Sequence, residues 1–391
     1  MNINTRLRDR TYRASCASLG FLSASSIAIP ICLVAISKEF GFSLTQGGAL
    51  GLMSSVMQFI LLIASSVLAA RFGKIRLLRV GLFTLAVGLF LFILSKSWIH
   101  AALLMLIIGA GSALLDGLLT PIVEDLFPND DGTKMNLLHA FWPMGTFVCV
   151  LSFGELLTSG VSWRFLFVSL AIILTIVMFW YPSSRKIPLP QSRADFSHMG
   201  EILRLPRFWI LGSALGLAGG AEAAFAFWSA SYIQISFNAL PRAGAFGVAA
   251  FAVGMAVGRL YSSKIAGKIG LRRLMLISLV AGVLVSSSFF LIQNLLSLYL
   301  FLVVIGLCVA SLWPSIQSYA AAQLRVDATV LMIFLSCFGL PGFSAATFIM
   351  GVIGDARGLR TSFIVAPINL TIALVLLLVD SRLARRKQKT I

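Results

Sequence analysis

Two acidic residues lie inside long apolar stretches, Asp116 between residues 99 and 127 and Glu222 between residues 208 and 235. Each stretch is long enough to cross a bilayer as a helix. An ionised Asp at the bilayer centre costs at least about 2.5–3.5 kcal/mol, so such groups normally face a cavity and have a function. A carboxyl group in a low-dielectric cavity binds a proton more readily than one in water, so proton uptake and release is the predicted chemistry. The alternative is a protonated carboxyl that only hydrogen-bonds a neighbouring helix.

Polar and aromatic side chains recur at helical spacing near the first of these carboxyls. Thr120 follows Asp116 by one turn, and Asn136, His139 and Trp142 are one turn apart at the start of the next apolar stretch. Amide and imidazole groups can hydrogen-bond hydroxyls, and an indole ring can stack on the apolar face of a sugar. We predict that these residues line a binding site. A helix–helix hydrogen bond remains the alternative for His139.

A second aromatic pair, Trp228 and Tyr232, lies one turn apart in the stretch that contains Glu222. We predict that both rings line the same site if Gly219 and Gly220 reshape the helix, as carriers often permit. An aromatic belt at the outer membrane interface is the alternative for both residues.

The elements that carry these residues are predicted to be membrane helices. Of the 391 residues, 59% are hydrophobic and only 12% are charged, unlike the balance in a soluble domain. We therefore predict an all-α membrane protein with twelve spans joined by short loops. The spans are expected near residues 15–36, 45–69, 78–96, 99–127, 135–158, 163–182, 208–235, 243–263, 273–293, 296–322, 328–353 and 361–380.

The basic excess indicates a membrane topology. The net charge is +17, and when successive loops alternate in side, 25 of the 31 Lys and Arg fall on the side of the two termini. Positive charge marks the cytoplasmic face, so both termini are predicted to be cytoplasmic. We expect a monomer in a bacterial inner membrane that contacts anionic headgroups and binds no nucleic acid.

The sequence repeats itself at an offset of 197 residues. The aligned pairs include Ser66 and Ser263, Gly109 and Gly306, Phe141 and Phe338, and Gly145 and Gly342. The same offset relates Asp116 to Trp313 and Thr120 to Gln317, which predicts that Trp313 and Gln317 also line the site.

This duplication predicts two pseudo-symmetric six-helix bundles, residues 1–182 and 207–391, joined by a cytoplasmic linker at residues 183–206. Two such halves are typical of carriers that bind a solute near the bilayer midplane and expose it to each side in turn.

The loops after the second and eighth spans resemble the cytoplasmic signature of the major facilitator superfamily, a tight turn of glycine, aspartate and basic residues. In that family the turn helps to latch the two halves. The residues that match are Arg71, Gly73, Lys74 and Arg76 in the first loop and Lys268, Gly270 and Arg272 in the second. Ala70 and Gly267 replace the aspartate of the family. An ordinary positive-inside loop is the alternative for the basic residues.

Spans four, five and seven resemble the sugar-transporting branch of that superfamily, the fucose-permease and glucose/galactose-transporter group. The resemblance lies in Asp116-Gly117, Thr120-Pro121, residues 136–141 and residues 219–222. It implies a secondary transporter that moves a sugar or sugar-like solute by alternating access, with proton coupling through Asp116 and Glu222. The acidic residue of span one in the fucose permease has no counterpart here.

Other functions stay open at this point. An exporter of amphipathic compounds on the same fold is one alternative, and sodium is the alternative coupling ion. An integral membrane transferase would need a catalytic cluster, for which Asp130-Asp131 is the candidate pair. The sequence contains no nucleotide-binding or hydrolase motif and no metal-binding cysteine spacing, so we expect no enzyme activity, cofactor or metal.

Overall fold

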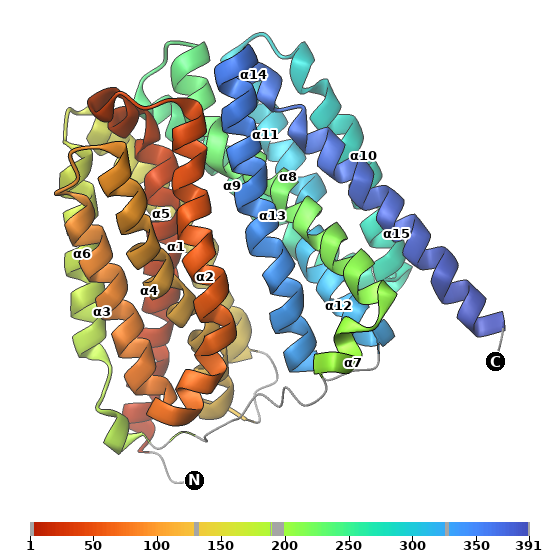
Figure 1. Cartoon of the computed structure of the whole chain (residues 1–391), viewed down its shortest axis with the longest axis horizontal. Helices are drawn as coiled ribbons and strands as arrows, with labels where there is room; N and C mark the ends of the chain where they lie inside the picture. Colours follow the sequence, from red (N-terminus) through yellow and green to blue (C-terminus); the bar gives the residue numbers. More distant parts are fainter. Residues whose placement is uncertain (1–3, 129–132, 188, 190–198, 325–327, 390–391) are drawn as a thin grey trace. The chain divides into compact units, whose positions relative to one another are not determined.

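The computed structural model describes the chain apart from residues 1–3, 129–132, 188, 190–198, 325–327 and 390–391. Within the described residues every regular element is a helix (Figure 1). Twelve stretches of the described chain are long and apolar enough to cross a membrane. The predicted all-α class with twelve spans is therefore confirmed, and the chain is an integral membrane protein.

The first compact unit comprises residues 1–42 and 53–194. Its helices are α1 (Thr5–Phe40), the part of α2 (Leu44–Phe72) after Leu52, α3 (Lys74–Phe92), α4 (Trp98–Leu126), α5 (Thr133–Thr158), α6 (Trp163–Trp180) and the 3-10 turn η1 (Ser184–Lys186). In this unit α1 packs along α5, and α3 packs along α4 and α6. The helices α4 and α5, which carry predicted site residues, are thus packed against α3 and α1 respectively.

The second compact unit comprises residues 43–52 and 195–391. Its helices after the start of α2 are α7 (Met199–Leu203), α8 (Pro206–Ser236), α9 (Pro241–Ile269), α10 (Leu271–Ser287), η3 (Ser288–Leu291), α11 (Leu295–Val309), α12 (Leu312–Leu324), α13 (Ala328–Arg357), α14 (Leu359–Ser362) and α15 (Val365–Lys389). Here α8 packs along α13, α15 and α9, and α9 packs along α11. Spans ten and twelve each contain two of these helices, α11 with α12 and α14 with α15.

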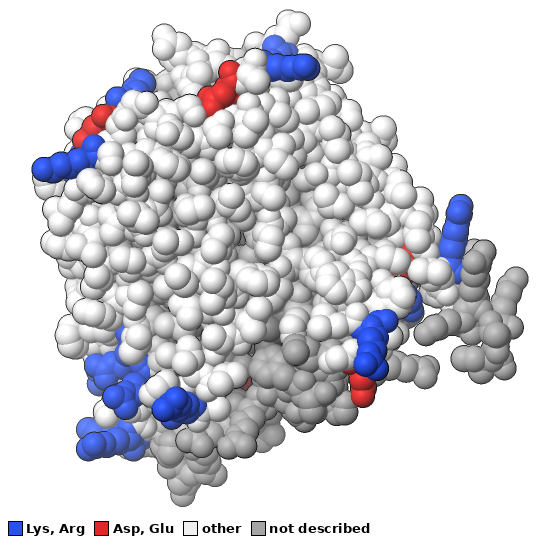
Figure 2. Space-filling model, in the orientation of Figure 1, with Lys and Arg blue, Asp and Glu red and all other residues white. Residues whose placement is uncertain are grey.

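The exposed surface has the polarity that a bilayer requires. On the face shown in Figure 2, the described charged side chains gather near the ends of the helices, and the surface between them carries none. Large apolar side chains such as Phe83, Phe179, Leu284 and Leu300 are exposed on the helices. Lipid tails can cover such side chains at no cost, whereas water could not.

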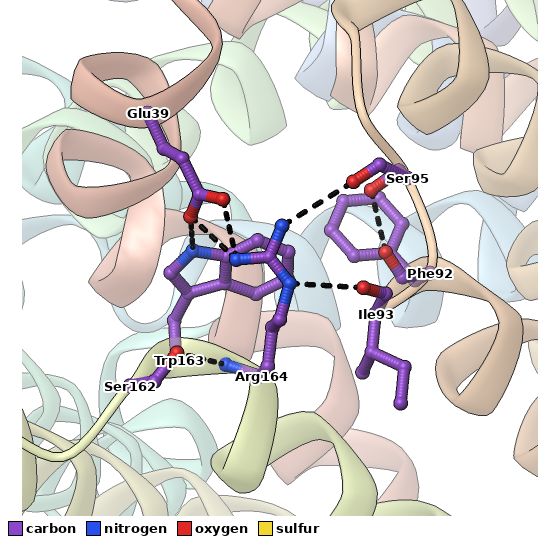
Figure 3. A network of polar contacts seen from close by, with 7 residues as sticks. All are labelled: Glu39, Phe92, Ile93, Ser95, Ser162, Trp163 and Arg164. Carbon is purple, nitrogen blue, oxygen red and sulfur yellow. Dashed lines mark hydrogen bonds and ion pairs between the residues drawn. The ribbon is translucent and has the colours of Figure 1, made fainter.

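Arg164, at the start of α6, fixes the ends of α1 and α3 (Figure 3). Its guanidinium donates to the carbonyl oxygens of Ile93 at 2.9 Å and Ser95 at 3.3 Å, and it pairs with Glu39 at 2.5 Å. Glu39 also accepts a hydrogen bond of 2.8 Å from the indole of Trp163. One side chain thus satisfies carbonyl groups that the end of α3 leaves without a helical partner.

Arg360, in α14, repeats this arrangement in the second unit. It donates to the carbonyl oxygens of Phe290 at 2.8 Å and Ile292 at 3.0 Å. Both acceptors lie 197 residues after the two carbonyls that Arg164 contacts. The predicted pseudo-symmetry of the two bundles therefore extends to individual hydrogen bonds.

Two close helix crossings repeat in the same way. A Cβ atom at Gly145 would overlap the carbonyl oxygen of Gly20, and one at Gly342 would overlap the carbonyl oxygen of Gly216. Only glycine lets α5 cross α1, and α13 cross α8, at this distance. These crossings fix the positions of α5 and α8, which carry several of the predicted site residues.

Candidate functional site

Asp116 lies in α4, ten residues before the end of this helix, and its side chain is exposed. It makes no hydrogen bond or ion pair with another residue that the structure describes. An ionised carboxylate at this depth is costly against lipid, so an exposed one must face water or a polar cavity. Thr120, one turn further along α4, is half-buried and can share that space.

The residues predicted on α5 lie near the part of this helix that α1 holds. His139 is exposed and Trp142 is half-buried, whereas the side chain of Asn136 lies outside the described part of the structure. Ser23 of α1 donates a hydrogen bond of 2.7 Å to the carbonyl oxygen of Trp142 and shares a second, of 2.5 Å, with the hydroxyl of Thr146. These bonds fix the α5 backbone at the predicted site.

Glu222 of α8 faces a basic residue of α9, Arg259. An Nη2 atom of Arg259 lies 3.9 Å from Oε1 of Glu222, with 25% of the Glu222 side chain and 43% of the Arg259 side chain exposed. Arg259 lies inside the predicted span 243–263, and because α9 continues to Ile269 it is ten residues before the end of the helix. The signal in the sequence was a basic residue within an apolar stretch.

The two aromatic residues predicted on α8 are packed inside the second unit. Trp228 is fully buried, and its indole donates a hydrogen bond of 3.0 Å to the carbonyl oxygen of Thr347. The ring of Tyr232 is buried against Phe289 and Phe363, with centroid distances of 5.3 Å to each. Both rings are enclosed by other side chains in this structure. Their contact with a solute therefore stays a prediction.

The repeat-related pair on α12 lies beside the helix that carries Glu222. Trp313 is half-buried, and its ring occupies the space that a side chain at Gly339 of α13 would need. The same ring lies over Gly219 of α8, three residues before Glu222. Gln317, also half-buried, donates a weak hydrogen bond of 3.4 Å to the hydroxyl of Ser336.

Comparison with known proteins decides the family. A family model described as Major Facilitator Superfamily matches residues 14–346 and 241–390. This chain belongs to the Major Facilitator Superfamily. An uncharacterized MFS-type transporter of Yersinia pestis is 21% identical over 360 residues, which cover 90% of this chain and 92% of that protein. The membrane protein MosC of Rhizobium meliloti is 28% identical over 266 residues, which cover 67% of this chain and 64% of that protein.

Solved structures of MFS transporters share the fold of the whole chain. A bacterial homolog of the human lysosomal transporter Spinster, inward-facing and occupied, has a TM-score of 0.82 at 14% identity, over 97% of this chain and 98% of that chain. A mutant of the nucleoside transporter NupG has a TM-score of 0.77 at 14% identity, over 96% of this chain and 99% of that chain. The superfamily predicted from the loops is confirmed, and the sugar-transporting branch stays a prediction.

The first loop with the MFS signature is anchored by one of its basic residues. Lys74 is buried, and its Nζ atom forms an ion pair of 2.5 Å with Asp125 at the end of α4. Gly73 has φ 84°, a conformation that favours glycine, and so ends α2 and begins α3 without a further residue. Arg71 and Arg76 are exposed on either side of this turn.

The second such loop repeats the turn with different anchors. Gly270 has φ 81° between α9 and α10. Arg272 is half-buried and donates a hydrogen bond of 2.7 Å to the hydroxyl of Ser381 in α15, whereas Lys268 is exposed. Each loop is thus held by one basic residue, and latching of the halves by these loops stays a prediction.

Sequence reasoning missed a buried ion pair at the start of α8. Asp380 of α15 is fully buried and accepts from Nε of Arg207 at 2.7 Å and from Nη2 at 3.0 Å. The hydroxyl of Tyr319 donates to the same carboxylate at 3.2 Å. Asp380 is an acidic residue at the end of the last apolar stretch, directly before the basic C-terminal tail. This position was the only signal in the sequence for its role.

Proposed function

We propose that this MFS transporter is a proton-coupled secondary carrier of a small polar solute, with a sugar or sugar-like compound as the substrate class. It would work by alternating access in a bacterial inner membrane, with both termini cytoplasmic and residues 1–182 and 207–391 as its halves. The observation that carries the proposal is that Asp116 and Glu222 lie deep in membrane spans without being sealed by packing.

Proton coupling follows from the cost of enclosing these carboxylates. Closing helices around an ionised Asp116 removes it from water, which is costly, whereas the protonated group can be enclosed with one hydrogen bond. A carrier that must bind a proton before it changes conformation is driven by the proton gradient. The described part of α4 offers Asp116 no basic partner that would keep it ionised.

The side chains proposed to bind the solute offer complementary chemistry. Hydroxyl, amide and imidazole groups can hydrogen-bond solute hydroxyls, and the indole rings can cover its apolar face. These residues are Thr120, Asn136, His139, Trp142, Trp228, Tyr232, Trp313 and Gln317. The proposed gating residues in the cytoplasmic loops are Arg71, Gly73, Lys74, Arg76, Lys268, Gly270 and Arg272.

The proposal is tested in proteoliposomes that contain the purified protein and a pH-sensitive dye. A transported solute from a panel of sugars is expected to carry protons inward, and an imposed pH gradient should drive its accumulation. Asp116→Asn keeps the size of the side chain but cannot take up a proton, so gradient-driven accumulation should be lost. Glu124→Gln, on an exposed residue near the end of the same helix, is the matched control and should transport normally.

The outcome separates coupling from folding. Asp116→Asn should elute and melt like the unchanged protein, because its side chain has no partner to lose among the described residues. Undiminished gradient-driven uptake in this variant would eliminate Asp116 as a coupling group. Equal loss in Glu124→Gln would show that the effect is not specific to the proposed carboxyl.

A further inference from the structure

Arg259 lies at membrane depth. Helix α9 has 29 residues, and Arg259 is ten residues before its end. At 1.5 Å per residue this is about 15 Å from one end and about 27 Å from the other. The hydrocarbon core is about 30 Å thick, so a bilayer centred on this helix would enclose Arg259. A guanidinium keeps its charge in proteins and offers five N–H donors and no acceptor.

Arg259 also has unused hydrogen-bonding capacity. At 3.9 Å its contact with Glu222 is an ion pair without a hydrogen bond, and its side chain donates to no other described residue. The Arg–carboxylate pair at the start of α8, in the same unit, is different. Arg207 and Asp380 form two hydrogen bonds, and the exposed fractions of their side chains are 13% and 1%, against 43% and 25% for Arg259 and Glu222.

The face of α9 that carries Arg259 is suited to a ligand. Ala256 and Ala252, one and two turns before Arg259, are small and half-buried, and Ser263, one turn after it, is exposed. The exposed apolar residues Val257 and Leu260 point to other sides of the helix, where lipid can cover them. A charged side chain facing lipid would be costly, so we expect the exposed part of Arg259 to face a polar space.

We propose that Arg259 binds an anionic group of the transported solute and that Glu222 holds the guanidinium when no solute is present. A planar guanidinium fits a carboxylate or a phosphate with two parallel hydrogen bonds, which the loose contact with Glu222 does not provide. The solute class is therefore a small polar acid, such as a sugar acid or a sugar phosphate. This inference rests on the proposed transport function and narrows its substrate class.

The repeat supports a functional role for this pair. Counterparts of Glu222 and Arg259 at the offset of 197 residues are Ser25 and Leu62, which carry no charge. The first unit therefore folds into the same helices without an ion pair at this place. An anionic ligand that replaces Glu222 as the partner of Arg259 also keeps the net charge of the site balanced. The ligand neutralises the guanidinium, and the released Glu222 carboxylate can accept the co-transported proton.

The test is ligand-induced thermal stabilisation of the purified full-length protein, since a ligand stabilises the state that binds it. The probes are matched sets: glucose, glucuronate and glucose 6-phosphate; galactose and galacturonate; glycerol, glycerate and glycerol 3-phosphate. At least one acid should raise the melting temperature more than its neutral partner. Comparison of carboxylates with phosphates then identifies which anion is bound.

Variants assign the effect to Arg259. Arg259→Gln should weaken binding of that acid by about 10- to 100-fold, the range expected for loss of hydrogen bonds to a charged group. Arg259→Lys keeps the charge and should retain part of the affinity. Glu222→Gln removes the competing carboxylate and should strengthen binding. Lys264→Gln, on an exposed basic residue one turn further along α9, is the matched control and should bind as the unchanged protein does.

Each outcome decides the inference. It is overturned if no acid in the panel stabilises the protein, or if a neutral compound stabilises the unchanged protein and Arg259→Gln equally. In the second case a carrier of neutral solutes remains, so the proposed function stands. Loss of acid binding in Arg259→Gln together with intact gradient-driven uptake in Asp116→Asn would support this inference and refute Asp116 as the coupling group.

Discussion

Asp380→Asn tests how much the buried ion pair at the start of α8 stabilises the second unit. The carboxylate is fully buried and accepts two hydrogen bonds from Arg207 and one from Tyr319. Removing one partner of a buried pair typically costs about 3–5 kcal/mol, because the remaining charge is buried without compensation. Arg207 lies in the first turn of α8 and can move its head group towards water, so we expect a cost near the lower limit, about 3 kcal/mol.

The measurement is reversible unfolding of the purified protein in mixed detergent, with a double-mutant cycle. Asp380→Asn and Arg207→Gln should each destabilise the protein, and the double variant should lose clearly less than the sum of both, because neither charge is then left unpaired. The control is Asp9→Asn, which removes the 3.4 Å pair of Arg8 and Asp9, whose side chains are 37% and 48% exposed. That change should cost at most about 1 kcal/mol.

Two results would refute this reasoning. Equal destabilisation by Asp380→Asn and Asp9→Asn would mean that burial does not determine how much stability is lost with an ion pair. Additivity in the double variant would mean that Arg207 and Asp380 do not stabilise each other. Binding of solute should be unchanged in Asp380→Asn, since this carboxylate is enclosed by protein side chains and reaches no open space.

Two further predictions concern helix ends. Arg164→Gln should destabilise the protein by about 2–3 kcal/mol and Arg360→Gln by about 1–2 kcal/mol. Both variants lose two hydrogen bonds to carbonyl oxygens, but only Arg164→Gln also loses a described ion pair. Equal losses of stability in thermal unfolding would contradict this. Asp355→Asn should cost about 0.5–2 kcal/mol, because within the second unit this carboxylate accepts from the first backbone N–H groups of α2, at Leu44 (2.9 Å) and Thr45 (2.8 Å). Hydrogen exchange of these two amides should be faster in the variant, and unchanged exchange would rule out the cap.

The spans and their number could be predicted because they depend on composition along the chain. A helix in lipid must form all its backbone hydrogen bonds within itself and be apolar over roughly 20 residues. Both requirements can be recognised from the order of residues along the chain. The repeat was visible for a similar reason, since the glycines at crossings such as Gly145 and Gly342 cannot be replaced without overlap. These features follow from local constraints.

The polar pairs could not be predicted because they join residues that are distant in sequence. Arg207 and Asp380 are 173 residues apart, and the sequence does not say which faces of α8 and α15 meet. Arg259 lies inside the predicted span 243–263, but the sequence does not say that it meets Glu222 of α8. The packing of Trp228 against Thr347 likewise depends on the rotation of α8 against α13.

The repeat distinguishes residues that maintain the helical scaffold from residues with a proposed function. Groups that hold helix ends and crossings occur twice, as Arg164 and Arg360 or as Gly73 and Gly270, because both units need the same backbone geometry. The groups with unused bonding capacity at membrane depth occur once.

Asp116 corresponds to Trp313, Glu222 to Ser25 and Arg259 to Leu62. A charge at membrane depth that the common scaffold does not require must be offset by a benefit that only one unit provides. For Asp116 and the Glu222–Arg259 pair, the benefit that we propose is binding of a proton and of an anionic solute. If the Arg259 and Glu222 variants bound and transported as the unchanged protein does, the asymmetry of the repeat would have no functional meaning.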